Sequence, residues 1–369
     1  MVWKPRARFL DWPKNAVELP TEEVIKLYAN RFAGATYDPD AVEEFRSAML
    51  QPDGEQVATS TGIADTGAGR LVMPFVYVLE MFPGCWPGCQ GQARGDCVSW
   101  DTRNASLFTM TCDIVSGQLD EKSGKPEEKP EVPDEGIADG VLSTETFYWY
   151  RGYDGDGWSC PAAATVACKK SGLMVRKNYT DLGVDLTKYS GKNAGKYGSK
   201  TPGSEAQRLD GEHLIHQATE LSSPEACRDF LFNGYGISTC GGEGLSDKRD
   251  ANGWSKRSGS WAHAMAYIGF DDRPVVKQIY GEPGVLDLNS WKDWNSGPRD
   301  IVESAALVPL EKKDLWIKLG IVNASTGNIM IPEGSCWVPY SQVRNREMIA
   351  FSGANGWPRK ILPEVTWWL

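Results

Sequence analysis

The sequence predicts an α+β fold in which helix-forming segments precede strand-forming segments along the chain. Residues 98–114 have the length and the lack of breakers of a helix, and residues 159–172 predict a second one that ends near Gly172. From about residue 237 the chain changes to short apolar segments separated by turn residues, which is typical of an antiparallel sheet. This order favours two segregated halves with a functional site between them.

The size and the charge of the chain limit the classes of partner. Its 369 residues, 41 % hydrophobic and 24 % charged, suffice for one large domain with an appendage or for two domains. A formal net charge of -10, with no cluster of Lys and Arg, argues against nucleic acid as a partner. Residues 1–15 lack the apolar core of a secretion signal, and no segment approaches the length of a membrane span. We therefore expect no membrane partner and a location in the cytoplasm or in a particle packaged from it.

The cysteines predict neither a disulfide framework nor a metal site. Nine are present, and their spacing lacks the density found in small disulfide-rich secreted domains, so mostly reduced thiols are expected. Cys85, Cys89 and Cys97 form the tightest group, but the C-x2-C pairs and the matching histidine of a usual zinc site are missing. The sequence thus predicts no metal and no cofactor.

The first seventy residues are expected to form an N-terminal extension. Residues 19–32 and 38–50 each combine a helix start signal with apolar residues at helical spacing. Residues 59–70 are rich in Gly, Ser and Thr and predict a linker. We therefore place the extension at residues 1–70 and the main domain at residues 71–369.

Further elements of the main domain follow from local patterns. Residues 71–82 predict a strand, residues 143–152 a helix, and residues 315–322 one of the later strands. Residues 116–140 mix charges of both signs with Pro and Gly and contain almost nothing apolar, which predicts a solvated acidic insertion loop. Such a loop lengthens the chain without contributing to the core.

A cysteine and a histidine stand at the ends of predicted elements. Cys97 follows a polar, glycine-bearing turn and occupies the first turn of the helix at residues 98–114. His263 lies at the start of an apolar strand, where we expect its ring to be half-buried, whereas His213 and His216 lie together in a polar segment. A lone histidine in such a strand is more often a core residue than a catalyst, so His263 gains meaning only together with other motifs.

The next predicted strand supplies those motifs. It ends in Asn289, Ser290 and Trp291, where an amide can accept the imidazole N–H and an indole can shield that bond from water. In this chain order, the three motifs around Cys97, His263 and Asn289 resemble those of the papain-like cysteine peptidases. The resemblance implies a two-lobed fold, with a helical lobe that carries the nucleophile helix and an antiparallel β lobe.

Other segments extend the resemblance over most of residues 71–295. Residues 155–179 look like the family's glycine-bearing turn, helix and following apolar run, and residues 143–150 stand where its Ser-Glu-Gln helix lies. Residues 335–358 resemble phage and bacterial relatives more than lysosomal ones. This points to phage virion proteins as assembly partners through residues 1–70, which serve either as a docking arm or as an inhibitory propeptide; we favour the arm.

The sequence also departs from the family pattern. The family has a glutamine six residues before the nucleophile, but here that position is Gly91, flanked by Gln90 and Gln92. Either glutamine can supply the oxyanion-hole amide, and we favour Gln92 because it is closer to the nucleophile and has glycines near it. The residue after the nucleophile, usually aromatic, is Val98.

The resemblance implies a mechanism and leaves two alternatives. Cys97 would act as the nucleophile toward a peptide bond of a peptide or protein substrate and His263 as the acid and base, the two forming an ion pair, while Asn289 orients the imidazole. One alternative is a catalytically silent papain-like structural or binding protein of a phage particle. The other is a transamidase or peptidoglycan hydrolase that uses the same Cys-His pair.

Overall fold

The structure is a computed structural model. It describes residues 40–41, 54–86, 91–117, 141–151, 157–169, 172–198, 215–292, 294–344, 346–353, 356–360 and 362. Within these ranges no helix is both long enough and apolar enough to cross a bilayer.

An antiparallel sheet forms one half of the molecule. Its strand order is β4-β9-β5-β6-β7-β8, and β1 pairs with the free part of β6. The strands are β1 Leu71–Val72, β4 Ala218–Glu220, β5 Ile237–Leu245, β6 Arg257–Asp271, β7 Gly284–Leu288, β8 Ser335–Pro339 and β9 Glu347–Phe351. The long strand β6 pairs with β1, β5 and β7 and is therefore the organising strand of the sheet.

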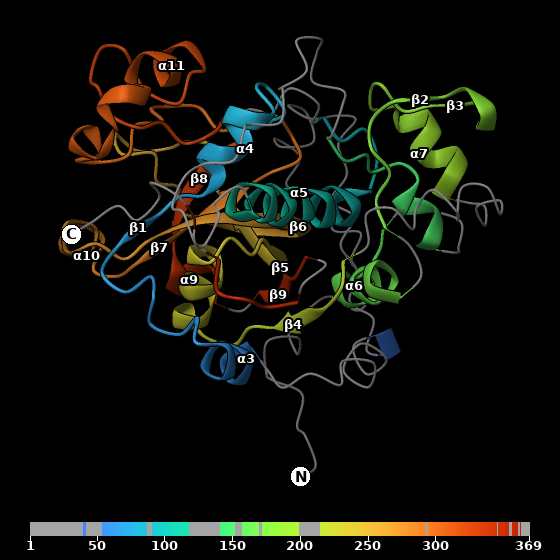
Figure 1. The fold of residues 1–369 in the computed structure, drawn as a ribbon, viewed down its shortest axis with the longest axis horizontal. Coiled ribbons are helices and arrows are strands. Elements are labelled where there is room, and N and C mark those ends of the chain that lie inside the picture. Colours follow the sequence, from blue (N-terminus) through green and yellow to red (C-terminus); the bar gives the residue numbers. More distant parts are fainter. Residues whose placement is uncertain are drawn as a thin grey trace.

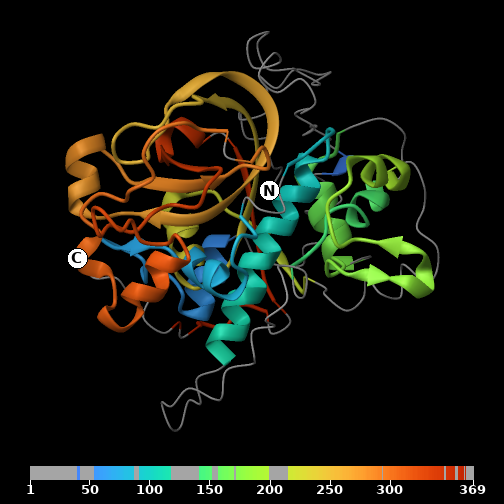
Figure 2. The same ribbon diagram turned by 90° about the horizontal axis from the view of Figure 1, so that it is seen from above.

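Helix α5, Cys97–Gly117, packs against β5 and β6 and lies between two groups of elements (Figure 1, Figure 2). We call residues 54–86 and the described residues from 215 onward the sheet lobe. The described residues between 141 and 198 form the helical lobe on the other side of α5. The two lobes and α5 share one buried apolar core, and a smaller apolar cluster lies within the helical lobe alone.

The remaining elements cover these layers. In the sheet lobe they are α3 Gly54–Thr61, α4 Phe75–Met81, α9 Pro224–Phe232, α10 Pro274–Tyr280, η5 Ala305–Leu307, η6 Leu310–Lys312, α11 Lys313–Lys318 and α12 Tyr340–Val343. In the helical lobe they are η2 Phe147–Arg151, α6 Cys160–Lys169, β2 Asn178–Tyr179, η3 Thr180–Leu182, β3 Val184–Asp185 and α7 Gly191–Gly198. The predicted α+β fold, with a helical part ahead of an antiparallel sheet, is confirmed.

Two predicted strands are wrong. Residues 71–82 contain only the two-residue strand β1, because Pro74 supplies no ladder N–H and the fully buried residues after it continue as α4. An apolar run that is buried all round does not distinguish strand from helix. Residues 315–322 contain the end of α11, in which Trp316 is the buried residue and Leu315 is 46 % exposed. The helix predicted at residues 143–152 is only the short 3-10 helix η2.

Part of the predicted N-terminal extension is integrated into the sheet lobe. Ile63 is completely buried in the common core, and α3 packs on α9. Asp229 accepts backbone hydrogen bonds from Asp65 and Gly67 at 2.6 and 3.1 Å, and Asp272 accepts one from Gly69 at 2.6 Å. Residues 54–70 therefore form a fixed connection to β1. Residues 1–39 and 42–53, and residues 118–140 of the predicted insertion loop, lie outside the described residues.

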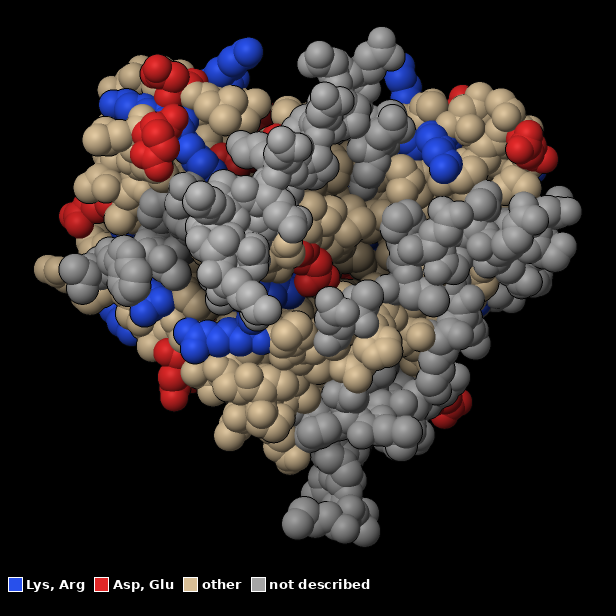
Figure 3. All heavy atoms as spheres, viewed as in Figure 1, with Lys and Arg blue, Asp and Glu red and all other residues tan. Residues whose placement is uncertain are grey.

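Acidic and basic side chains are interspersed on the face shown in Figure 3. Its described part carries both signs close together.

Candidate active site

Cys97 is the first residue of α5 and is completely buried. The helix starts here because the Asp96 carbonyl accepts hydrogen bonds from the backbone N–H groups of Ser99 and Trp100, at 3.0 and 3.2 Å. Cys97 thus lies in the first turn of a helix, at the predicted position. A helix N-terminus favours a negative charge, which for a cysteine is the nucleophilic thiolate.

The loop before Cys97 is bound to the residue after Asn289. The Gln92 N–H donates to the Ser290 carbonyl at 3.0 Å, and the Ser290 hydroxyl donates to Gln92 Oε1 at 2.7 Å. Gln92 Nε2 donates to the Arg94 carbonyl at 2.5 Å. These bonds bring the start of α5 to the end of β7. The other candidate, Gln90, lies outside the described residues.

Two tyrosines of the helical lobe hold the same loop from the opposite side. The Tyr189 hydroxyl donates to Asp96 Oδ2 at 2.9 Å and accepts from the Ala93 N–H at 3.2 Å. The Tyr148 hydroxyl donates to the Gly95 carbonyl at 3.1 Å. Burial, and then the negative charge of Asp96, raise the pKa of Tyr189, so its hydroxyl stays protonated and keeps its hydrogen-bond geometry. No local sequence pattern indicated these two tyrosines, since their contacts lie far along the chain.

His263 lies in the middle of β6, opposite Gly241 of β5, rather than at the start of a strand. Its Nε2 is 3.0 Å from Asn289 Oδ1. Asn289 is the first residue after β7, and its Oδ1 also accepts the Trp291 backbone N–H at 3.0 Å. An oxygen that accepts two N–H groups fixes the amide orientation and assigns the imidazole proton to Nε2.

Trp291 covers the histidine–asparagine pair. Its ring stacks on the His263 ring with centroids 4.3 Å apart and an interplanar angle of 27°, and Trp291 is completely buried. Trp261, two residues before His263 and on the same side of β6, contacts both rings edge-on. The indoles therefore exclude water from the bond between His263 and Asn289.

The environment of His263 favours its neutral form. Only 2 % of its surface is exposed, and this burial lowers its pKa to about 3, although the bond to Asn289 opposes the shift. The charge of Arg346 lowers the pKa further. Burial therefore disfavours the imidazolium form that the expected ion pair with Cys97 requires. With its proton on Nε2, Nδ1 is left as a basic nitrogen that finds no hydrogen-bond partner in the described part of the chain.

A buried ion pair supports β7 close to the site. Arg346 Nη1 is 2.6 Å from Asp287 Oδ2, and Arg346 Nη2 donates to the Glu243 carbonyl at 3.1 Å. Burial raises the pKa of Asp287, and the guanidinium beside it opposes the rise. Removal of one partner of such a pair strands a buried charge. The pair thus ties β5 and the start of β9 to the strand that leads into Asn289.

The cysteines differ from the prediction at one pair. Cys160 and Cys240 form a disulfide, which sequence spacing did not indicate because the partners are 80 residues apart. Cys112, Cys227 and Cys336 are buried free thiols, as expected for most cysteines, while Cys89 lies outside the described residues. No group of three or more His, Cys, Asp or Glu side chains in the described ranges is arranged to hold a metal ion.

The other two histidines have no place in this arrangement. His216 is exposed at the surface before β4, and His213 lies outside the described residues. Of the residues that the sequence singled out, the structure therefore brings Gln92, Asn289 and Trp291 together with His263 at one end of the sheet. The start of α5 with Cys97 is bound to the same end through Gln92 and Ser290.

Comparison with known proteins finds similarity at the level of structure only. No protein-family model matches the sequence, and no curated protein is similar to it in sequence. The chain is similar to the cysteine protease xylellain from Xylella fastidiosa, with 13% identity and a TM-score of 0.42 over 87% of this chain and 91% of that one. It is also similar to procathepsin B S9 from Trypanosoma congolense, with 12% identity and a TM-score of 0.39 over 89% and 87% of the two chains. A third is the proform of the ragweed cysteine protease Amb a 11, with 12% identity and a TM-score of 0.39 over 72% and 61%. All three are cysteine proteases.

Proposed function

We propose that this protein is a cysteine peptidase that hydrolyses peptide bonds through an acyl-enzyme intermediate. The observation that supports the proposal most is the buried His263–Asn289 hydrogen bond under Trp291, at the point where the loop leading to Cys97 is bound to Ser290. A histidine with a purely structural role has no need of a helix that begins with a cysteine close to it. This combination is suited to nucleophilic catalysis.

In the proposed first half-reaction, His263 Nδ1 takes the proton of the Cys97 thiol while Sγ attacks the scissile carbonyl carbon. The resulting oxyanion is stabilised by the Cys97 backbone N–H and by the Gln92 side-chain amide. The same amide donates to the Arg94 carbonyl, which orients it in the loop directly before the nucleophile. The C–N bond then breaks, and the departing amine takes the proton from His263.

In the second half-reaction, neutral His263 takes a proton from a water molecule, which attacks the thioester. The C–S bond breaks, the acid product leaves, and the proton returns to Cys97. Asn289 keeps the Nε2–H direction fixed throughout, so that Nδ1 faces the reacting atoms in both steps. The neutral imidazole favoured by burial is the form that can accept a proton in each step.

Labelling and turnover test this proposal together. The epoxide E-64 or iodoacetamide at pH 6 to 7, followed by peptide mapping, should modify Cys97 far faster than the buried thiols Cys112, Cys227 and Cys336. Peptide hydrolysis should be present in the wild type and absent in Cys97→Ala. Equal labelling of all these cysteines would favour the catalytically silent structural protein, and release of product only in the presence of an added amine acceptor would favour the transamidase.

The proposed partners follow from the same chemistry. A peptide or protein is the substrate of the site, while association with virion proteins through residues 1–70 and a cytoplasmic or virion location stay predictions. Sedimentation of the full chain alone and with a particle fraction is the measurement for the association.

A further inference from the structure

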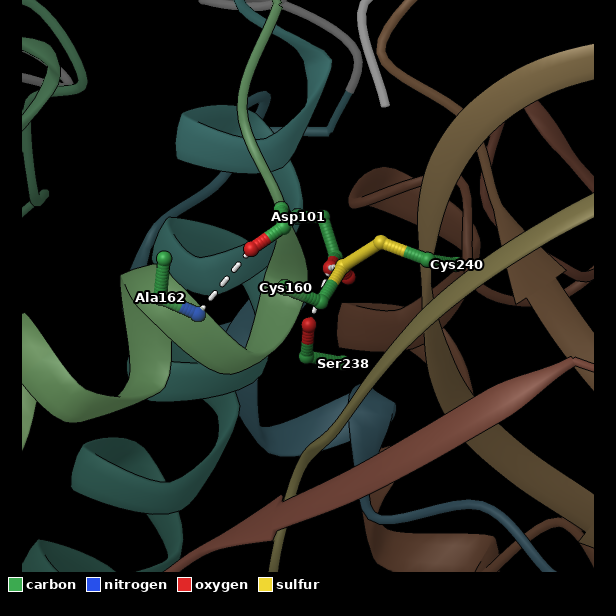
Figure 4. The surroundings of a disulfide bond; sticks show 6 residues. Asp101, Cys160, Ala162, Ser238 and Cys240 are labelled. Atoms are coloured by element: carbon green, nitrogen blue, oxygen red, sulfur yellow. Dashed lines mark hydrogen bonds between the residues drawn. A yellow bond between two sulfur atoms is a disulfide. The ribbon is translucent and has the colours of Figure 1, made fainter. Parts of the chain in front are cut away.

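The Cys160–Cys240 disulfide joins the two lobes of the molecule. Cys160 is the first residue of α6 in the helical lobe, and Cys240 lies on β5 in the sheet lobe (Figure 2, Figure 4). It is the only disulfide among the described residues. Its two Cα atoms are 6.3 Å apart and 80 residues apart along the chain. The bridge therefore limits how far α6 can move from the sheet.

The bridge also lies beside the candidate catalytic residues. Cys240 pairs with Ala264 across β5 and β6, and the next pair is Gly241 with His263. On the opposite side, Asp101 lies one turn after Cys97 on α5, and its Oδ2 is 3.7 Å from Cys160 Sγ (Figure 4). The Ser238 hydroxyl of β5 donates a hydrogen bond to this same carboxyl group.

The alignment of α5 with the sheet does not depend on the bridge. Helix α5 packs on β5 and β6 along much of its length, and the loop before it is bound to Ser290. The bridge instead ties α6, and with it the helical lobe, to β5. Breaking the bridge removes the covalent link between α6 and β5, while the packing of α5 against the strand of His263 remains.

The boundary between the two lobes, which the bridge crosses, is closed to solvent at the candidate catalytic residues. Cys97 is completely buried, and His263 and Asn289 are 2 % and 1 % exposed. A peptide reaches these residues only after neighbouring atoms move apart, and a covalent bond across the lobes opposes such movement. The two bridged cysteines are equally buried, at 1 % and 2 % exposed, so a reductant reaches them only during such movement.

We propose that the Cys160–Cys240 disulfide is a thiol-exchange site at which a dithiol reductant controls the access of peptides to Cys97. The proposal rests on the peptidase function argued above. In the oxidised protein the lobes are held together and Cys97 is shielded, and in the reduced protein the helical lobe moves away from β5 and the site opens.

The exchange balances as an ordinary dithiol–disulfide reaction. A thiolate of the reductant attacks Cys240 Sγ, the bond between the two protein sulfurs breaks, and Cys160 Sγ leaves with the electron pair. Cys160 takes a proton from the Asp101 carboxyl group, which regains one from water. The second thiolate of the reductant then displaces Cys240, which is protonated by water, so the protein gains two thiols and the reductant becomes a disulfide.

Asp101 is suited to that proton transfer. Burial raises its pKa well above the ordinary value, which favours the protonated acid, although the Ser238 hydrogen bond opposes the rise. Its contact with Cys160 makes Cys160 the sulfur that leaves.

The test compares the rate at which E-64 and iodoacetamide modify Cys97 in three proteins. These are the wild type with the bridge intact, the wild type reduced with dithiothreitol, and the double variant Cys160→Ala/Cys240→Ala, with the bridge verified by intact mass. We expect E-64, which is peptide-sized, to react at least 10-fold faster with the two forms that lack the bridge. Iodoacetamide, being small, should show a smaller ratio.

Two controls separate the possible failures. The variant Cys227→Ala/Cys336→Ala removes two buried thiols that take no part in the bridge and should keep the wild-type difference between oxidised and reduced forms. Equal E-64 rates with and without the bridge, in proteins whose Cys97 is selectively reactive, would overturn the proposal alone. If Cys97 of the bridge-free forms is no more reactive than Cys112, the peptidase function fails, and this inference with it. Should the double variant not fold, the chemically reduced wild type gives the same comparison.

Asp101→Asn tests the proton transfer by itself. Asn retains an acceptor for Ser238 but supplies no acidic proton, so reduction of the bridge by dithiothreitol should slow at least severalfold, beyond the pH dependence that the dithiothreitol thiolate gives to both proteins. Once reduced, the variant should react with E-64 at the wild-type rate. An unchanged reduction rate and pH profile would remove Asp101 from the exchange.

Discussion

The two sides of the candidate site are held in place by different means. On the sheet side, His263 and the end of β7 are positioned by backbone pairing, with His263 opposite Gly241 and Leu288 opposite Ala266. On the helix side, the loop before Cys97 is positioned by side chains, chiefly the hydroxyls of Tyr189 and Ser290.

This difference predicts where single substitutions matter. A strand register is shared by many backbone hydrogen bonds, so one side chain contributes little to it. A loop held by three or four side-chain hydrogen bonds loses a large share of its support when one of them is removed. The helix side should therefore be the more sensitive of the two to residues that do no chemistry, whereas on the sheet side the buried Arg346–Asp287 pair is the main residue pair of that kind.

The largest effects are expected from the reacting residues on both sides. Cys97→Ala and His263→Ala should each lower kcat/KM by at least about 10,000-fold, because nucleophile and base act as a unit. Asn289→Ala should be less severe by about two orders of magnitude, since an orienting residue is partly replaced by water. The rate of peptide hydrolysis by each variant shows the order of these losses. Cys112→Ala, on the same helix as Cys97, is the control. A loss at Asn289 as large as that at Cys97, in a folded protein, would give Asn289 a different role.

Next in size is the oxyanion amide on the helix side. Gln92→Ala should lower kcat by about 100- to 1000-fold, because it removes one donor to the oxyanion. Gln90→Ala is the matched control and should have little effect at unchanged thermal stability. A large loss at Gln90 together with none at Gln92 would reverse the assignment.

A substitution of a residue that takes no part in the reaction tests the comparison between the two sides most directly. Tyr189→Phe removes the hydroxyl that holds both Asp96 and Ala93, and we expect a loss in kcat of about 10-fold from the misplaced loop. Tyr179→Phe, in the same lobe, removes a hydroxyl that donates to the Val175 carbonyl at 2.9 Å, away from the loop. Equal activity of the two variants would show that the loop does not depend on its tyrosine.

Two shortened chains test the boundary of the sheet lobe. A chain starting at Leu71 lacks the buried residues Val57 and Ile63, and should lose about 3 to 6 kcal/mol of unfolding free energy relative to one starting at Gly54. Urea unfolding of the two chains measures the difference. Equal stability would return residues 54–70 to the role of a linker, and greater activity of either chain than of the full one would support a propeptide at the N-terminus.

The smallest expected effect is the pH dependence that His263 gives to stability. Its pKa of about 3 in the folded protein lies below the unfolded value near 6.5, so the unfolded state binds more protons between these limits. The free energy of unfolding should therefore fall as the pH drops from 6.5 toward 3, by at most about 1.4 kcal/mol per pH unit from this group. Urea unfolding at pH 7 and pH 5 should show a smaller decrease in His263→Gln, and an identical decrease would mean that His263 is not buried and neutral.

Several features of the molecule were determined by the sequence alone. The start of α5 at Cys97 is local, because the turn before it and the breaker-free run after it specify a helix start. The proximity of His263 to Asn289 is largely local as well, because successive apolar segments of a chain tend to pair as neighbouring strands, as β6 and β7 do. The α+β fold follows from such local patterns in order.

Only the tertiary structure decided the features that depend on contacts between distant residues. The Cys160–Cys240 pairing, the support of the loop by Tyr189 and the packing of residues 54–70 on α9 each join segments that are separated by many residues. The low pKa of His263 also depends on distant residues, since the burial that lowers it is produced by the indoles and the helix packed around the ring. Periodicity and spacing describe a residue's immediate neighbours along the chain, whereas burial and pairing are properties of the assembled fold.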